Sequence, residues 1–224
     1  MSQVRVVAFD AYGTLLDVQS ILDVARETLD DRAVNVVDLW RAKQLEYSWL
    51  RTLMGTYADF DQVSRDALSY ALAYFRAEIS DVERQRLLDS WFRPNPFPDV
   101  PDALAALTET GMPLVILSNG SPEMLKLALE HSGLEQFFEH VLSVDAVKRF
   151  KPDPAVYRLV EERIGVLPKE TLFVSSNGFD VAGAKAFGFH VCWINRAGRP
   201  LDVLGQTPDR VIASMSELPG VVRG

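Results

Sequence analysis

The chain has 224 residues, of which 48% are hydrophobic and 24% are charged, as in an ordinary soluble globular protein. This length allows one substantial domain, or a core domain with a smaller insertion. The formal net charge of -8 argues against nucleic acid as a partner, because binding to phosphate backbones needs clustered Lys and Arg. No apolar run approaches the roughly 18 residues that would span a membrane.

Two features predict a cytoplasmic location. Met1–Gln3 lead straight into a predicted strand, without the basic and apolar regions of a secretory signal. Cys192 is the only cysteine, so no intrachain disulfide can form, and a reducing compartment is the simplest setting. Because Cys192 lies within a predicted strand, we interpret it as a thiol packed in the core rather than as a nucleophile.

The first predicted strand covers residues 4–10, a β-branched apolar run that stops at Asp10 and is followed by a Gly-Thr turn. Residues 17–93 then contain no convincing strand. A proline-rich stretch at 93–98 breaks the helical pattern. We interpret this region as an inserted helical cap with a return linker, so that the cap covers 17–96 and the core covers 1–16 and 97–224. The four cap helices are predicted at 21–29, 37–54, 60–75 and 81–91.

The rest of the chain alternates strands with helices, which predicts a parallel sheet covered by helices on both faces. One helix begins at the N-cap Ser121 and another at the N-cap Asp153, and each N-cap is followed by proline. A third helix covers 180–187. The fold class is therefore α/β, with a Rossmann-like doubly wound core and an inserted α-helical cap. The remaining strands are predicted at 113–119, 140–144, 171–175, 190–194 and 210–213.

Polar residues follow four of the predicted strands. In an open parallel sheet such loops meet at the carboxyl edge, where ligands bind. The convergence of four polar loops means more than any one of them alone. The loops are Asp10 to Thr14, Ser118-Asn119-Gly120, Val147 to Asp153, and Ser175 to Asp180.

Each loop permits a chemical interpretation and a plainer one. Asp10 can act as a covalent nucleophile, kept ionised by a cation such as Lys151, but Asp also caps turns and a lone Lys is usually solvated. The backbone N–H groups at 118–120 precede a helix and suit a carboxylate or phosphate, although a capping turn has the same sequence. Thr14 equally fits an N-cap. Taken together, the four loops favour a catalytic site.

These motifs resemble the haloacid dehalogenase superfamily, and within it the L-2-haloacid dehalogenase family, over essentially the whole chain. The resemblance is carried by Phe9 to Leu15, by the cap-helix run Trp40 to Arg51, and by Leu117 to Gly120. It continues through Ser143-Val144-Asp145 with Phe150-Lys151-Pro152, and through Val174 to Asp180. The first loop, the cap-helix run and the fourth loop are specific in combination.

The resemblance implies a reaction and its catalytic residues. Asp10 would displace halide from the carbon of a short-chain L-2-haloacid with inversion, and water would hydrolyse the resulting aspartyl ester to a D-2-hydroxy acid. Arg41 would receive the halide, with Asn119 beneath it, since a guanidinium stabilises developing negative charge. Lys151 would hold Asp10 ionised. Four residues would support Lys151 and the water: Thr14, Ser175, Asn177 and Asp180.

The resemblance also implies how the substrate is bound. Its carboxylate would sit near Ser118 and the backbone N–H groups of Ala11, Tyr12 and Asn119. Leu45 shares the helical face of Arg41, four residues away. An isolated Arg41 would ordinarily be a surface salt bridge, and single aromatics are ordinarily core residues. The apolar wall around the alkyl group would consist of Leu45, Phe60, Tyr12 and Phe179.

Tyr12 bears on the choice between a halide and a phosphate ester. Phosphatases of this superfamily carry a second Asp at that position, which protonates a leaving alkoxide. A halide leaves as a stable anion and needs no such acid. Phosphoryl transfer would also need Mg²⁺ held by several oxygen ligands. We therefore expect neither a metal nor another cofactor.

Two rival functions stay open on the sequence: a phosphatase or phosphonatase on the same fold, and a non-catalytic anion-binding protein. The expected partners are a 2-haloalkanoate substrate and halide, with no nucleic acid and no membrane. Because the family is often dimeric and the cap is rich in aromatic residues, we also expect a homodimer.

Overall fold

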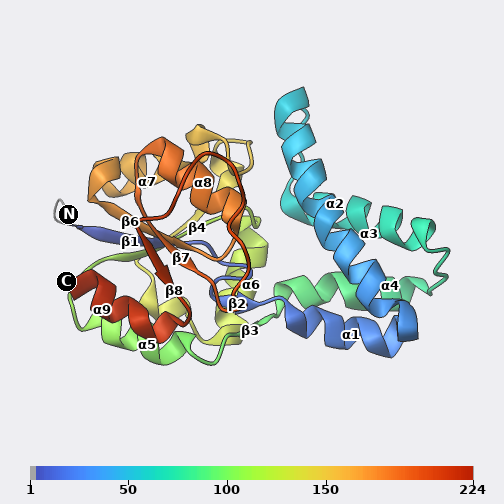
Figure 1. Ribbon diagram of the computed structural model, residues 1–224. Coiled ribbons are helices and arrows are strands. Elements are labelled where there is room, and N and C mark those ends of the chain that lie inside the picture. Colours follow the sequence, from blue (N-terminus) through green and yellow to red (C-terminus); the bar gives the residue numbers. More distant parts are fainter. Residues whose placement is uncertain (1–3, 224) are drawn as a thin grey trace.

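The computed structural model describes residues 4–223 and contains a parallel sheet with helices on both faces (Figure 1). Met1–Gln3, which we expected to lead into the first strand, lie outside the described residues. The strand order is β5-β4-β1-β6-β7-β8, and every neighbouring pair in this sheet is parallel. The strands are β1 (Val6–Phe9), β4 (Leu114–Ser118), β5 (His140–Ser143), β6 (Thr171–Ser175), β7 (His190–Ile194) and β8 (Arg210–Ile212).

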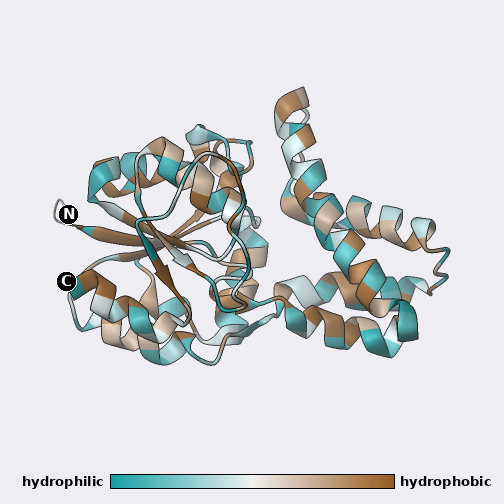
Figure 2. Ribbon diagram, viewed as in Figure 1, coloured by the Kyte–Doolittle hydropathy of each residue, from teal (hydrophilic) through white to brown (hydrophobic). Residues whose placement is uncertain are grey.

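The sheet is central because its inner strands are apolar on both sides. All residues of β1, β4 and β6 are buried, as expected of parallel strands covered on two faces. Figure 1 shows α7 and α8 on one face and α5 and α9 on the other, and Figure 2 shows the strands as the most hydrophobic part of the core. The core helices are α5 (Val100–Thr108), α6 (Pro122–Ser132), α7 (Pro154–Ile164), α8 (Gly178–Phe187) and α9 (Leu218–Arg223).

The predicted helix signals act as expected. Ser121 and Asp153 accept hydrogen bonds from backbone N–H groups of the first helical turn, and each precedes a proline. The glycines after α6, α7 and α8 have left-handed backbone angles, which end those helices. Short 3-10 turns connect the core elements at Glu135–Phe137, Val144–Ala146, Pro168–Glu170 and Met215–Glu217.

The cap lies to one side of the sheet and is built mainly of helices (Figure 1). Its first helix is followed by the 3-10 turn Asp30–Arg32, and its last by the 3-10 turn Ser90–Phe92. The second helix begins four residues earlier than predicted, and the fourth ends at Asp89 rather than at Trp91. The helices are α1 (Gln19–Leu29), α2 (Ala33–Met54), α3 (Phe60–Tyr74) and α4 (Asp81–Asp89).

The two chain crossings between core and cap form a small antiparallel pair that the sequence did not predict. β2 (Leu16–Asp17) pairs with β3 (Asn95–Pro96), so the proline-rich return linker is not wholly irregular. Strands of two residues carry no alternation of polar and apolar positions, and therefore leave no periodic signal. This pair brings the exit from the core and the return to it side by side.

Two further findings concern the chain as a whole. Cys192 is a free thiol buried in β7, as its sequence position predicted, and burial raises its pKa to about 12. Within residues 4–223, no helix has both the length and the apolar character that crossing a membrane requires.

Candidate active site

Asp10 occupies the centre of the carboxyl edge of the sheet. It follows β1, which lies between β4 and β6, and its backbone N–H donates to the carbonyl of Val174 (3.0 Å). Only 6% of its surface is exposed. A turn follows at Gly13, whose φ of 85° favours glycine, and Thr14 then faces back toward the carboxylate. The sheet therefore delivers one carboxylate into a closed site.

Three of the four predicted loops supply hydrogen bonds to the Asp10 carboxylate. Lys151 Nζ donates to Oδ1 at 3.1 Å. Thr14 Oγ1 and Asn177 Nδ2 both donate to Oδ2, each at 2.9 Å. The structure thus brings together residues that lie up to 167 positions apart in the chain. Together the three donors hold the carboxylate in one orientation, as a nucleophile requires.

Lys151 also contacts the second carboxylate of the site. Its ammonium lies 2.9 Å from Asp180 Oδ2, and both side chains are almost fully buried. Tyr157 donates from Oη to Asp180 Oδ1 at 2.8 Å. Our sequence analysis missed Tyr157, because it lies on the buried face of α7 and resembles any core aromatic. The only available signal was that a buried phenol usually needs a hydrogen-bond partner.

The electrostatics of these groups follow from burial and charge. Burial raises the pKa of Asp180 to about 6, with the charge of Asp10 adding to the effect and Lys151 opposing it. Burial would lower the pKa of Lys151, but the Asp10 and Asp180 carboxylates outweigh it and raise this pKa. Burial also raises the pKa of Tyr157, which therefore stays a neutral donor. Lys151 is thus charged, whereas Asp180 changes its charge in the weakly acidic range.

Hydrogen bonds between the first and fourth loops fix their geometry. Thr14 Oγ1 accepts from the Ser176 N–H (2.9 Å), and Ser176 Oγ donates to the carbonyl of Gly13 (2.8 Å). Ser175 Oγ accepts from the Asn177 N–H at 3.2 Å. The hydroxyls of Ser175 and Thr14 thus bond within these two loops. Their expected support of Lys151 and the hydrolytic water stays a prediction. Ser176 is a further positioning residue that our sequence analysis did not assign.

The second loop presents hydrogen-bond donors beside Asp10. Asn119 Oδ1 accepts from the backbone N–H of Lys151 (3.0 Å), and the two N–H donors of its amide have no acceptor among residues 4–223. Ser118 is buried, and its Oγ accepts from the Gly120 N–H. Within residues 4–223, the backbone N–H groups of Ala11, Tyr12 and Asn119 have no acceptor. Unpaired donors of this kind suit an anion.

Arg41 enters from the cap on α2. The residue as a whole is half-buried, and its guanidinium carbon Cζ lies 5.3 Å from the centre of the Trp91 ring. Among the described residues it has no hydrogen bond and no ion pair. Burial lowers its pKa, while the charge of Asp10 acts in the opposite direction. The predicted salt-bridge alternative for Arg41 is therefore not what the structure shows.

The cap is fastened to the loop that carries Lys151. Trp49 Nε1 donates to the Lys151 carbonyl (3.0 Å), and Thr52 Oγ1 accepts from the Phe150 N–H (3.0 Å). Tyr57, in the loop between α2 and α3, donates to Asp145 of the core. Because α2 carries both Arg41 and Trp49, these bonds also determine where Arg41 stands.

The predicted apolar wall is dispersed over the cap and the core. Phe60, at the start of α3, packs on Phe150 at 6.0 Å between ring centres, and Phe179 packs on Trp49 at 5.3 Å. Tyr12 is buried with its ring 5.7 Å from that of Trp91. Leu45 is half-buried one helical turn beyond Arg41. Their role as a wall around the substrate stays a prediction.

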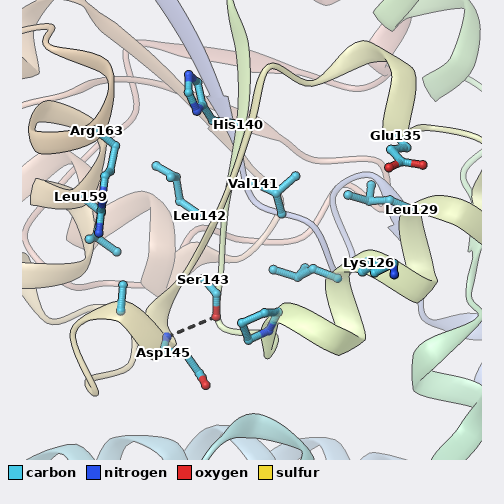
Figure 3. Close-up of a pocket in the computed structure, with 13 residues that line it drawn as sticks. Lys126, Leu129, Glu135, His140, Val141, Leu142, Ser143, Asp145, Leu159 and Arg163 are labelled. Carbon is cyan, nitrogen blue, oxygen red and sulfur yellow. Dashed lines mark hydrogen bonds between the residues drawn. The ribbon is translucent and has the colours of Figure 1, made fainter.

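Two other features of the molecule bear on where its sites lie. A cavity of about 850 Å³ lies beside the edge strand β5 and α6, and Figure 3 shows Ser143 and Asp145 at its rim. None of the residues that contact Asp10 lines it, so it is distinct from the candidate active site. Across residues 4–223, no group of three or more His, Cys, Asp or Glu side chains is arranged to hold a metal ion.

The chain belongs to the haloacid dehalogenase-like hydrolases, whose family model matches residues 4–188. It is 44% identical to the (S)-2-haloacid dehalogenase of Pseudomonas sp. (strain YL), over 96% of this chain and 93% of that one. It is 45% identical to haloacetate dehalogenase H-2 of Moraxella sp. (strain B), over 97% of each. The solved structure of L-2-haloacid dehalogenase from Xanthobacter autotrophicus with chloropropionic acid covalently bound has a TM-score of 0.94 and 41% identity, with 99% of each chain covered. These relatives confirm the resemblance inferred from the motifs.

Gly183→Ala should disturb Asp180 indirectly, through the side chain of Tyr157. A Cβ at Gly183 would come within 2.6 Å of Pro152 Cβ and would clash with the Tyr157 hydroxyl. We expect a loss of about 1–3 kcal/mol in the free energy of unfolding and a lower activity, because Tyr157 must move off Asp180. The control is Gly220→Ala in α9, where a Cβ meets nothing within 4 Å. Urea unfolding and halide-release assays of both variants test this; wild-type stability and activity in Gly183→Ala would contradict it.

Proposed function

We propose that the chain is an (S)-2-haloacid dehalogenase, which hydrolyses short-chain L-2-haloacids to D-2-hydroxy acids with inversion through an ester on Asp10. The names of the relatives support the substrate class. The covalently bound chloropropionic acid in the Xanthobacter autotrophicus structure supports a covalent intermediate. The reaction is the hydrolysis of a carbon–halogen bond.

The observation that carries this proposal is the state of Tyr12, two residues after the nucleophile. Its hydroxyl donates to the carbonyl of Trp91 at 3.1 Å, and burial raises its pKa. A phenol that is engaged and reluctant to ionise is a poor acid for an alkoxide leaving group. A halide leaves as an anion without protonation. The first loop therefore suits halide departure and not the hydrolysis of a phosphate ester.

In the first step, Asp10 attacks the halogen-bearing carbon, the carbon–halogen bond breaks, and halide departs with the bonding electrons. Lys151, Thr14 and Asn177 orient the carboxylate for this attack. The halide is received by the Arg41 guanidinium and the free amide donors of Asn119. Both stabilise charge only as it develops on the halogen, and such interactions are those that accelerate a reaction.

In the second step, water attacks the carbonyl carbon of the ester and the bond from that carbon to the alkoxide oxygen breaks. The proton taken from the water passes to that oxygen, so that the hydroxy acid leaves and the Asp10 carboxylate is restored. We assign Asp180 as the base that accepts the water's proton, since burial places its pKa near the range in which a base works best. Tyr157 and Lys151 hold its two oxygens. The ammonium of Lys151 also balances the negative charge that appears on the ester oxygen in this step.

Substrate orientation follows from the donors beside Asp10. The carboxylate of the haloacid binds Ser118 and the unpaired backbone N–H groups of Ala11, Tyr12 and Asn119. Binding the carboxylate at one end and the halogen at the other places the carbon between them, opposite Asp10. This arrangement is chiral, so it selects one enantiomer of the haloacid.

We expect halide release from L-2-chloropropionate and chloroacetate, and little or none from D-2-chloropropionate. Asp10→Asn should lower the rate by a factor of 10³ or more, because an amide oxygen does not displace halide. The measurement is chloride release under saturating substrate. No release from any haloacid would refute the proposal. Activity on phosphate esters that excess chelator abolishes would indicate a phosphatase, and substrate binding without turnover would indicate a binding protein.

Turnover should fall as the pH drops through about 6, because Asp180 accepts a proton only when ionised. Tyr157→Phe removes a hydrogen bond that lowers the pKa of Asp180, so the acid limb should move to higher pH. Asp180→Asn should release about one equivalent of halide and then stop. Profiles of kcat against pH, together with the size of the halide burst, test this. An acid limb that does not move in Tyr157→Phe would exclude Asp180 as the base.

We also propose that the protein is a homodimer formed through the cap. Apolar and aromatic side chains stand exposed on neighbouring surfaces of α2 and α3, namely Leu50, Leu53, Met54, Tyr70 and Tyr74. A groove of about 530 Å³ runs between these helices. Exposed apolar clusters of this kind usually mark interfaces, and a symmetric dimer buries the same patch on both copies.

Leu53→Glu should convert the dimer to a monomer, because Leu53 is 82% exposed and the pair would bring two carboxylates together. The measurement is sedimentation equilibrium at micromolar concentration. Val203→Glu is the matched control, since Val203 is 99% exposed but lies on the core. A wild-type chain that is monomeric at these concentrations would contradict the proposal.

The cytoplasm stays the proposed compartment, supported by the single buried thiol Cys192. Fractionation of cells that express the full chain tests it, and recovery outside the cytoplasm would contradict it.

A further inference from the structure

Arg41 has a charge that nothing in the described part of the chain compensates by direct contact. Its guanidinium makes no hydrogen bond or ion pair within residues 4–223, although the residue as a whole is half-buried. A guanidinium carries five N–H donors in a rigid fork, and an unheld side chain of this length would sample many rotamers. Catalysis at a fixed halogen requires the fork to be held in place.

The side chain that holds it is Trp91. The Arg41 guanidinium carbon lies 5.3 Å from the centre of the Trp91 ring, within the range of cation–π attraction, and Trp is the most favourable partner for this interaction. An aromatic face attracts the cation without neutralising it. A carboxylate in the same place would cancel the charge that the departing halide needs.

The Trp91 ring is itself fixed on two sides. Trp40 packs edge-on against it at 5.8 Å, and the Tyr12 ring lies 5.7 Å away. The Tyr12 hydroxyl also donates to the backbone carbonyl of Trp91. Only 2% of the surface of Trp91 is exposed, yet its Nε1 has no acceptor within residues 4–223. The indole therefore contributes its aromatic face to the contact with Arg41, and not a hydrogen bond through Nε1.

The position of Trp91 in the chain links three parts of the molecule. It lies in the 3-10 turn Ser90–Phe92, between α4 and the return linker. Arg41 comes from α2 of the cap, and Tyr12 follows the nucleophile by two residues. Contact with Trp91 thus ties the halide-receiving arginine to the nucleophile loop.

We propose that Trp91 is a positioning residue for halide departure, holding the Arg41 guanidinium over the active site on an aromatic face that leaves its charge uncompensated. The proposal rests on the dehalogenase function proposed above. It goes beyond that function by assigning a role to a residue that touches neither substrate nor nucleophile.

The test uses Trp91→Leu and Trp91→Phe in single-turnover halide release from L-2-chloropropionate and L-2-bromopropionate. Trp91→Leu should slow chloride release by roughly ten- to thirty-fold and bromide release less, because the poorer leaving group depends more on Arg41. Trp91→Phe, which keeps an aromatic face, should recover most of the rate. In an Arg41→Met background, Trp91→Leu should have no further effect, since its action passes through the arginine.

The matched control is Leu68→Ala in α3, a fully buried cap residue outside the site. It should lower the Tm without changing the bromide-to-chloride rate ratio. Equal slowing of both halides in Trp91→Leu, or full additivity with Arg41→Met, would overturn the proposal in favour of a packing role. A wild-type enzyme that releases no halide would instead refute the dehalogenase function, so the two failures are distinguishable.

Discussion

The structure depends on one buried cation, the ammonium of Lys151, held between the carboxylates of Asp10 and Asp180. Burying three charged groups is costly unless they are paired and hydrogen-bonded, and breaking such a pair typically costs about 3–5 kcal/mol. The backbone of Lys151 is equally constrained, because Asn119 accepts from its N–H and Trp49 donates to its carbonyl. The loops at the sheet edge and the cap are therefore assembled around a single residue.

This arrangement assigns the two negative charges of the proposed reaction, on the nucleophile and on the halide, to two different cations. Lys151 pairs with Asp10 on the core side. Within residues 4–223 no carboxylate pairs with Arg41, which comes from the cap side, where we propose that the halide departs. Asp180 shares the same ammonium, yet burial leaves its pKa raised, which supports the role of base that we propose for it in the second step. Hydrogen bonds from Trp49 and Thr52 hold α2, the helix that carries Arg41, against the loop of Lys151. In the proposed function the cap therefore contributes a residue, Arg41, to the site.

The sequence was informative where a residue's chemistry and its local pattern coincide. The β-branched run before Asp10, the proline-marked helix starts and the polar loop ends predicted the sheet and the convergence at its edge. No sequence signal marks the residues whose role depends on a partner far away in the chain. Tyr157 and Trp91 occupy buried aromatic positions that any core would have, and only the fold places them on Asp180 and Arg41. The sequence placed Ser175 in a loop of the site, but it did not show which hydrogen bond its hydroxyl makes. The two-residue strands β2 and β3 form only because the fold brings together the segments where the chain leaves the core and returns to it.

The central claim is that Asp10 is esterified and that water attacks the ester and not the substrate carbon. A single turnover in heavy-oxygen water, with enzyme in excess over L-2-chloropropionate, tests it most directly by mass spectrometry of product and protein. The account predicts that the label enters the peptide containing Asp10 and that the hydroxy acid carries unlabelled oxygen from the carboxylate. Label in the hydroxy acid, with none in that peptide, would contradict it.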